Sequence, residues 1–227
     1  METSSETLVR LANGFLCYQP PMDAPPVALP GPAGDPVFGS FNNITKLSAP
    51  CIDLWSRVLG EVANARLLLK SHQLADAAAR QTYRDQFVAR GIEPERLDLR
   101  GNLESLEQHL GLYGEVDVCL DPFPYNGTTT CEALWMGVPV ATLRGQHHRG
   151  RAGASLLTRV GLDDCVAEDG DVYVSIAAGL ARDTAGRADL RTGLRGRMAA
   201  LCDGDTFARD MEAAYRSMWR DWCLSEG

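Results

Sequence analysis

The sequence predicts an α/β fold built on a Rossmann-like parallel sheet. Short apolar segments alternate with helical segments from residue 37 to about residue 159, a pattern typical of strands joined by crossover helices. The 227 residues suffice for one large domain with a complete core. Hydrophobic residues make up 45% of the chain and charged residues 23%, which is typical of a globular protein. Because parallel sheets bind ligands at the carboxyl ends of their strands, we expect the site in the loops that follow the strands.

The first 36 residues differ from the rest of the chain. Seven prolines are crowded into residues 20–36, and proline favours an extended, non-helical backbone. Before them, residues 8–11 and 15–18 are apolar enough to favour burial. We therefore expect residues 1–36 to form a linker or strap that leaves another domain or lies across this one. The prolines are Pro20, Pro21, Pro25, Pro26, Pro30, Pro32 and Pro36.

The domain itself is expected to span residues 37–205, with five strands that alternate with helices. The strands are expected at residues 37–41, 65–70, 96–100, 116–120 and 139–143, and the helices at 48–64, 74–90, 103–112, a segment ending at 136, and 153–159. Ser48 followed by Pro50 marks the start of the first helix, since proline is favoured in the first helical turn. Beyond Asp163 the chain is expected to be mostly helical.

The last segment, residues 206–227, is expected to form an amphipathic helix. Its large apolar side chains recur at spacings of three and four, as on one helix face. Such a stripe is more typical of a core or an interface than of a cofactor site. The stripe consists of Phe207, Met211, Tyr215, Met218, Trp219 and Trp222.

The segment at residues 121–137, D-P-F-P-Y-N-G-T-T-T-C-E-A-L-W-M-G, has the character of an anion site. It follows the apolar strand expected at 116–120 and leads into a helix, and the unpaired N–H groups and dipole of a helix start attract anions. Gly127 lets the backbone approach a ligand closely. Thr128, Thr129 and Thr130 add hydroxyl donors at the same place. The segment therefore predicts a cradle for a nucleotide diphosphate.

Three further side chains are candidates for the same edge of the sheet. Glu132 lies in the first turn of that helix, where a carboxylate could accept hydrogen bonds from the vicinal hydroxyls of a sugar. Lys46 follows the first strand by five residues, so its ammonium could reach the edge and offset a developing phosphate charge. The alternative is a solvated lysine beside a helix start. His109 could face the ligand from the helix before the fourth strand, or lie at the surface.

The loop at 144–151 is cationic and follows the fifth strand. It carries His147, His148, Arg149 and Arg151, which could contact phosphate or remain an exposed loop without a ligand. Since adjacent histidines do not easily face the same way, at most one of them is a plausible contact. His72, just past the second strand, is a weaker candidate.

Other functional classes lack their motifs. No G-x-G-x-x-G follows the first strand, and no G-x-x-x-x-G-K-[ST] occurs, which argues against a nicotinamide-cofactor or P-loop domain. Gly39-Ser40 lacks the trailing glycine of a nucleophile elbow. The seven cysteines are scattered without a C-x-x-C spacing, so neither a disulfide framework nor a metal site is expected.

Charge and hydropathy also narrow the partners and the compartment. The net charge of −8 without a basic stripe argues against nucleic-acid binding. No apolar run reaches the roughly 18–20 residues of a membrane span, and residues 1–6 are acidic where a signal peptide would be basic. We therefore expect a cytoplasmic protein without a membrane partner.

Two strings of residues together resemble a known family. The first string is F-G-S-F-N-N followed by Lys46, and the second is the 121–137 segment with the V-P-V after it. They are similar to parts of the C-terminal half of bacterial O-linked N-acetylglucosamine transferases. These are the SPINDLY-like, often tetratricopeptide-linked members of glycosyltransferase family 41. The resemblance continues through residues 14–21, 151–157 and 207–219. It implies a two-lobed GT-B fold, of which this chain would be the C-terminal, donor-binding lobe, with UDP-N-acetylglucosamine as the usual donor and protein Ser/Thr hydroxyls as acceptors.

The resemblance also implies roles for individual residues. Asn43 would contact the nucleotide-phosphate region, and Lys46 would stabilise the leaving diphosphate without a metal. His109 would contact the uridine, and Glu132 the ribose hydroxyls, while the three threonines would hold the diphosphate. Relatives more often carry one further residue in the N-G…T-T stretch, which leaves the register there open. They also place a lysine on the helix before the fourth strand, where this chain has Leu106.

The family's N-terminal catalytic lobe, with its proposed general-base histidine, and the tetratricopeptide superhelix that binds acceptor proteins are absent from these 227 residues. A two-lobed cleft excludes water and orients the acceptor only when both lobes are present. We therefore expect a glycosyltransferase lobe that depends on an N-terminal partner lobe and is incomplete without it. The alternative is a non-catalytic nucleotide-binding or interaction module derived from such a lobe.

Overall fold

A computed structural model describes residues 6–29 and 34–225 of the chain. In these residues six strands form one sheet in the order β3-β2-β1-β4-β5-β6, and every neighbouring pair is parallel. This confirms the predicted α/β class and its parallel sheet. The strands are β1 (Val37–Ser40), β2 (Arg66–Lys70), β3 (Leu97–Arg100), β4 (Val118–Leu120), β5 (Val140–Leu143) and β6 (Val166–Ala167).

The first five strands lie where the sequence predicts them, whereas β6 was not predicted. It pairs with β5 through Thr142 and Val166, in a region expected to be mostly helical. With only two residues, β6 has no alternation that could reveal it.

Helices join the strands as expected, although several start later than predicted. The second begins only after Asp76, whose carboxylate accepts a hydrogen bond from the Ala79 amide, a favourable helix cap. The helices are α1 (Ala49–Glu61), α2 (Ala77–Val88), α3 (Leu106–Gly111), α4 (Thr128–Trp135), α5 (Ala152–Arg159), α6 (Gly170–Arg182), α7 (Thr184–Arg197), α8 (Ala199–Cys202) and α9 (Gly204–Ser225). The 3₁₀ turns that bear on the site are η1 (Ile44–Lys46), η2 (His72–Ala75), η4 (Leu112–Glu115) and η5 (His148–Gly150).

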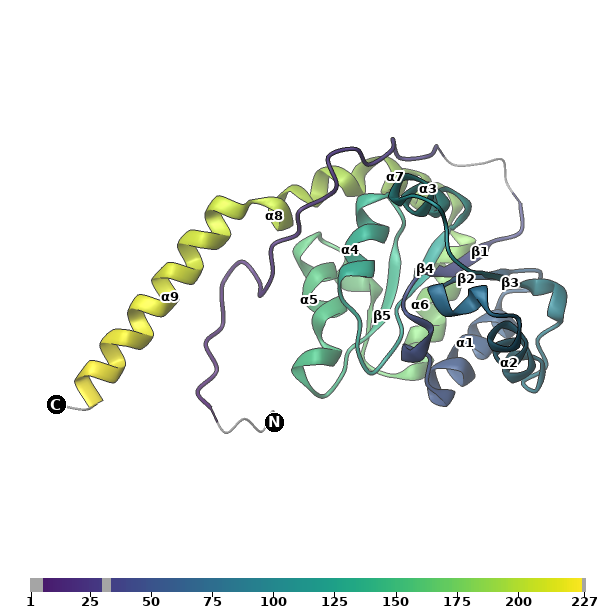
Figure 1. Ribbon diagram of the computed structural model, residues 1–227, viewed down its shortest axis with the longest axis horizontal. Coiled ribbons are helices and arrows are strands. Elements are labelled where there is room, and N and C mark those ends of the chain that lie inside the picture. The colour runs from purple at the N-terminus through teal and green to yellow at the C-terminus, as the bar shows by residue number, and fades with distance from the viewer. Residues whose placement is uncertain (1–5, 30–33, 226–227) are drawn as a thin grey trace.

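Helices cover both faces of the sheet, as Figure 1 shows. On β2, Leu67 and Leu69 pack into the core on one face, beneath α1, α2 and α6, whereas Leu68 packs into the core on the other face, with α4, α5 and α7. The buried Trp55 of α1 donates a 3.1 Å hydrogen bond to Tyr173 of α6. Both faces of the sheet are therefore closed, which leaves its edges and strand ends for ligands.

The strap, residues 6–29, is extended and has no helix or strand. It lies between α9 and the body of the domain and then crosses the end of the domain near α7 (Figure 1). Asn13 donates to Asp210 of α9 over 2.7 Å, and the amide of the buried Tyr18 donates to the Leu201 carbonyl over 2.8 Å. Leu8 stays 47% exposed, so the expected burial of residues 8–11 is incomplete. Residues 1–5 and 30–33, including Pro30 and Pro32, lie outside the described residues.

The C-terminal helix α9 projects away from the body of the domain (Figure 1). Its predicted apolar stripe is not core: Tyr215, Trp219 and Trp222 are 59%, 64% and 53% exposed. The Trp219 and Trp222 rings lie 5.1 Å apart on the surface. The core alternative is therefore wrong for this stripe, and a role as an interface stays a prediction.

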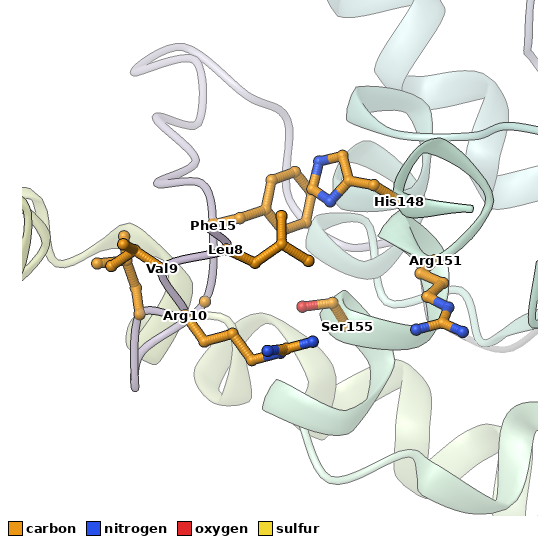
Figure 2. Close-up of a pocket in the computed structure, with 9 residues that line it drawn as sticks. Leu8, Val9, Arg10, Phe15, His148, Arg151 and Ser155 are labelled. Carbon is orange, nitrogen blue, oxygen red and sulfur yellow. The ribbon is translucent and has the colours of Figure 1, made fainter. Parts of the chain in front are cut away.

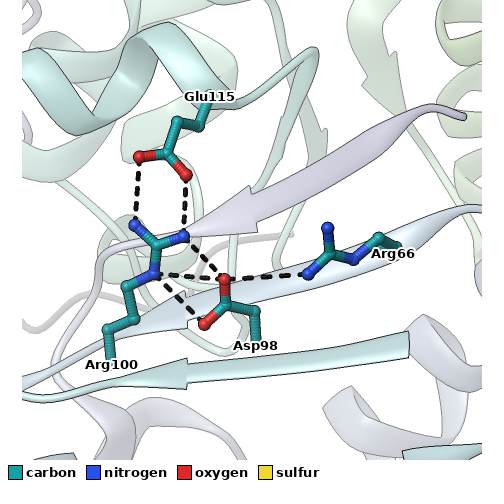
Figure 3. Close-up of polar contacts among 4 residues, drawn as sticks. All are labelled: Arg66, Asp98, Arg100 and Glu115. Carbon is teal, nitrogen blue, oxygen red and sulfur yellow. Dashed lines mark hydrogen bonds and ion pairs between the residues drawn. The ribbon is translucent and has the colours of Figure 1, made fainter. Parts of the chain in front are cut away.

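Two arginines hold η4 in place. On edge strand β3, Arg100 forms a bidentate contact with Glu115 of η4, at 2.7 and 3.0 Å, and also pairs with Asp98 (Figure 3). These two carboxylates raise the pKa of Arg100 above its ordinary value. From α7, the buried Arg191 donates to the carbonyls of Tyr113 and Val116. The turn η4, which leads into β4, is thereby fixed against β3 and α7.

Candidate functional site

The carboxyl ends of β2, β1 and β4 are adjacent in the sheet and carry three charged groups. Lys46 lies in the turn after β1, Lys70 is the last residue of β2, and Asp121 follows β4 directly. The chain contains twenty arginines but only two lysines, and both lysines lie at this edge, half-buried. The predicted position of the site at the strand ends therefore coincides with an unusual gathering of charge.

Lys46 is held against the loop at residues 121–127, which precedes α4. Its Nζ donates to Asn42 Oδ1 over 3.1 Å and lies 5.0 Å from the centre of the Tyr125 ring. Burial lowers the pKa of Lys46, and the negative charge of Asp121 counteracts part of that shift. The alternative of a merely solvated lysine is therefore not what the structure shows, and the ammonium is positioned beside the loop that leads to α4.

Asn43, by contrast, is exposed and serves as a local cap. Its Oδ1 accepts hydrogen bonds from the amide and hydroxyl of Thr45, at 3.0 and 2.9 Å, and from Gln73 Nε2 at 3.0 Å. These bonds tie η1 to η2 next to Lys46. A contact between Asn43 and a nucleotide stays a prediction.

The helix α4 starts at Thr128, directly after Gly127. A Cβ built on Gly127 meets no atom within 4 Å, so the backbone there faces open space. Thr128 is exposed and Thr129 is partly exposed. The glycine backbone and the first two threonines are therefore accessible at the start of α4, and their contact with an anion stays a prediction.

The prediction for the Thr130 side chain is wrong. Thr130 is 1% exposed, and its hydroxyl donates to Asp121 Oδ1 over 2.8 Å inside the domain. It therefore fastens the start of α4 to β4 and does not face a ligand.

Asp121 was not predicted and lies in a buried polar network. Desolvation raises its pKa from the ordinary 3.8 to about 7, while the Thr130 hydrogen bond and the Lys46 charge counteract part of the rise. Beside it, Asn126 donates to Thr142 Oγ1 over 3.1 Å and accepts from the Gly153 amide over 2.7 Å. The sequence did carry a signal for Asp121, because an acidic residue directly after a buried strand lies at the strand ends where parallel sheets bind ligands.

His109 and Glu132 form a second cluster at the same edge. His109 Nε2 lies 3.2 Å from Glu132 Oε2, and its Nδ1 lies 3.2 Å from Lys70 Nζ. The Tyr113 hydroxyl donates to the same Oε2 over 3.4 Å. The side chains of His109 and Glu132 are 14% and 21% exposed, so the surface alternative for His109 is wrong.

Aromatic rings enclose this cluster. The rings of Phe41 and Tyr113 each lie 5.8 Å from the His109 ring. Tyr113 is fully buried, and desolvation together with the Glu132 charge raises the pKa of its phenol well above the usual value. Leu106, where relatives were expected to carry a lysine, is 49% exposed at the start of α3. Lys70 and Tyr113 were missed, although a lysine ending a buried strand is itself a signal.

Arg151 and His148 face the strap. Arg151 Nε donates to the Gly145 carbonyl over 3.0 Å, and the Phe15 ring meets the His148 ring edge-on at 5.3 Å. Together with Leu8 and Ser155 they line a groove of about 360 Å³ between the strap and α5 (Figure 2). The predicted phosphate contact of Arg151 stays a prediction.

Two other features are absent from the described residues. In residues 6–29 and 34–225, no group of three or more His, Cys, Asp or Glu side chains is arranged to hold a metal ion. Within the same residues, no helix is both long and apolar enough to span a membrane.

Comparisons with known proteins identify the family and the fold of this chain. The family model described as Glycosyl transferase family 41 matches residues 28–211 of this chain. A rice protein (Oryza sativa subsp. japonica) named probable UDP-N-acetylglucosamine–peptide N-acetylglucosaminyltransferase SPINDLY is 44% identical over 96% of this chain and 24% of its own length. The chain thus spans about a quarter of the length of the curated relatives it matches.

Solved structures give the same assignment for the fold. A mutant O-GlcNAc transferase of Thermobaculum terrenum is 38% identical, with a TM-score of 0.88 over 98% of this chain and 43% of that protein. HepE of Anabaena, solved with UDP, is 16% identical with a TM-score of 0.55 over 81% of this chain and 49% of its own, and shows the fold alone. The architecture is that of the C-terminal lobe of GT-B glycosyltransferases. The chain belongs to glycosyl transferase family 41.

Proposed function

We propose that this chain is the donor-binding lobe of a glycosyltransferase, and that it binds UDP-N-acetylglucosamine for transfer of the sugar to protein Ser/Thr hydroxyls. One observation carries the proposal: Lys46 beside the start of α4 and the His109–Glu132 pair lie at one edge of the sheet. A cation beside a helix start suits a diphosphate, and a carboxylate one helical turn further suits the ribose of the same nucleotide. The names of the rice and Thermobaculum relatives support the donor and the acceptor class.

Each group has a distinct task in the proposed reaction. The acceptor hydroxyl oxygen attacks the anomeric carbon as its bond to the diphosphate breaks, so negative charge develops on the departing UDP. Lys46 and the amides at the start of α4, with the hydroxyls of Thr128 and Thr129, stabilise that charge. Glu132 accepts hydrogen bonds from the ribose, and His109 borders the base.

The proton released by the acceptor hydroxyl requires a base, which we assign to an N-terminal lobe. The same lobe would close the cleft and hold the acceptor protein, because a two-lobed cleft excludes water and orients the acceptor only when both lobes are present. Turnover is therefore proposed only for the two lobes together, whereas donor binding is proposed for this chain alone.

Calorimetric titration with UDP and UDP-N-acetylglucosamine tests donor binding, with GDP and ADP as competitors of different base. We expect saturable binding of the uridine nucleotides, weakened at least tenfold in Lys46→Ala and in Glu132→Gln, since each removes one charge-assisted contact. Glu107→Gln on the exposed side of α3 is the matched control. A folded sample that binds none of these nucleotides would refute the proposal and favour a non-catalytic interaction module, and preference for GDP or ADP would refute the uridine assignment.

A further inference from the structure

We propose that Lys70 is a positioning residue: it holds His109 in the neutral tautomer with the proton on Nε2, and thereby fixes Glu132 for the ribose hydroxyls of the nucleotide. The part that concerns the ribose rests on the proposed function. The part that concerns the tautomer rests on the contacts of three side chains from β2, α3 and α4.

The first step follows from the hydrogen-bonding capacity of the two groups. A lysine ammonium has three donors and no acceptor, whereas each imidazole nitrogen is either a donor or an acceptor. Lys70 Nζ lies 3.2 Å from His109 Nδ1. An ordinary ammonium loses its proton about four pH units above an imidazolium, so the lysine is the member of such a pair that keeps its proton. His109 Nδ1 must then accept.

The second step fixes the other nitrogen. With Nδ1 as the acceptor, the ring proton of neutral His109 lies on Nε2, which is 3.2 Å from Glu132 Oε2 and donates to it. The Tyr113 hydroxyl donates to the same oxygen. Both contacts fall on Oε2, although the Tyr113 hydroxyl lies equally 3.4 Å from the Thr129 carbonyl, so the His109 contact is the one that holds this oxygen and leaves Oε1 for a ligand in the proposal.

The groups around His109 favour this arrangement. The titratable and charged side chains that face the cluster are Lys70 from β2, Glu132 from α4, Tyr113 from η4 and Tyr18 from the strap. Burial lowers the pKa of Lys70, and the Glu132 charge counteracts that shift. A ring protonated on both nitrogens has no acceptor left, so it could not accept a hydrogen bond from the Lys70 ammonium at Nδ1.

A purely structural role for Lys70 predicts something different. If the lysine only packs its aliphatic stem against the end of β2, then methionine, which keeps a long apolar stem, should serve equally well. If the ammonium fixes the tautomer, methionine should fail and arginine, which restores a donor, should succeed.

The tautomer is measured by long-range ¹H–¹⁵N NMR on the ¹⁵N-histidine-labelled full chain without nucleotide. The chain has four histidines, and the His109 signals are assigned by their loss in His109→Gln. We expect the Nε2–H tautomer alone in the wild type, both tautomers in Lys70→Met, and a return to Nε2–H in Lys70→Arg. An Nδ1–H or doubly protonated ring in the wild type at neutral pH would overturn the proposal, and so would an unchanged tautomer in Lys70→Met. The wild-type measurement alone can overturn the proposal, even if a variant does not fold.

UDP titration of the same samples tests the consequence for the ribose. We expect about tenfold weaker binding in Lys70→Met and recovery in Lys70→Arg, the magnitude of one misaligned charge-assisted hydrogen bond. Wild-type affinity in Lys70→Met, together with a changed tautomer, would overturn the link to Glu132. Failure of the wild type to bind UDP would instead refute the proposed function, and the tautomer measurement would still stand on its own.

Discussion

Replacing Asp121 by asparagine is expected to change how the stability of the domain depends on pH. The carboxylate is buried, and its pKa is raised from 3.8 to about 7 because the charged form is desolvated. Between these two values the folded state binds more protons than the unfolded state, so the free energy of unfolding falls as pH rises. Burial of Asp121 therefore hardly lowers the free energy of unfolding near pH 4, and its full destabilising effect is present above pH 7.

The size of the effect follows from the shift. A difference of about three pKa units, at about 1.4 kcal/mol per unit, corresponds to up to about 4 kcal/mol. Asparagine keeps the oxygen that accepts from Thr130 but does not ionise. The free energy of unfolding of Asp121→Asn minus that of the wild type is therefore expected to increase by up to about 4 kcal/mol between pH 4 and pH 8.

Urea unfolding followed by circular dichroism at pH 4, 5.5, 7 and 8 provides the measurement, since the linear extrapolation gives the free energy in water. The matched control is Asp189→Asn, an exposed aspartate on α7, for which the same pH dependence is not expected. If the difference between Asp121→Asn and the wild type stays constant within about 0.5 kcal/mol from pH 4 to pH 8, the burial argument for Asp121 is refuted.

Three further substitutions, together with one control substitution, test the contacts that hold the domain around the site. Arg191→Met removes a buried guanidinium that donates to two backbone carbonyls, and thermal and urea unfolding should show a loss of roughly 2–4 kcal/mol; a loss below 1 kcal/mol would contradict it. Gly153→Ala puts a methyl group 2.5 Å from Asp121 Oδ2, so the free energy of unfolding should fall by about 1–3 kcal/mol. Its control is Gly179→Ala, where the added methyl group meets no atom within 4 Å. That substitution should be neutral or stabilising by up to about 1 kcal/mol. Arg100→Met breaks partly exposed ion pairs and should cost at most about 1 kcal/mol, and less at high salt; a loss above 2 kcal/mol would be inconsistent with this estimate.

The sheet and the position of the site could be predicted because they depend on local patterns. Apolar strands followed by polar loops indicated the positions of the first five strands along the chain, and Lys46 and Thr128 follow strands whose ends share one edge. A buried Thr130 was also within reach, since it lies four residues before Leu134 and three before Ala133, which are both buried on the same helix face.

Other features depend on contacts between distant parts of the chain. Lys70 and His109 are 39 residues apart, and they meet only because β2 and α3 end at the same edge of the sheet. The stripe of α9 has the same periodicity whether it packs inside this domain or against another surface, so its pattern alone did not reveal that Trp219 and Trp222 are exposed. Sequence periodicity gives the face of an element but not what covers it.

The confinement of both lysines to the site has a practical consequence for chemical handling of the protein. Amine-reactive dyes, cross-linkers and biosensor surfaces attach to lysine side chains and to the chain's amino terminus, and here the only lysines are the half-buried Lys46 and Lys70. Attachment through a lysine would therefore modify the proposed nucleotide site itself. Protection of either amine by a bound ligand would give a direct footprint of occupancy, whereas ligand-binding measurements on immobilised protein call for coupling through another group.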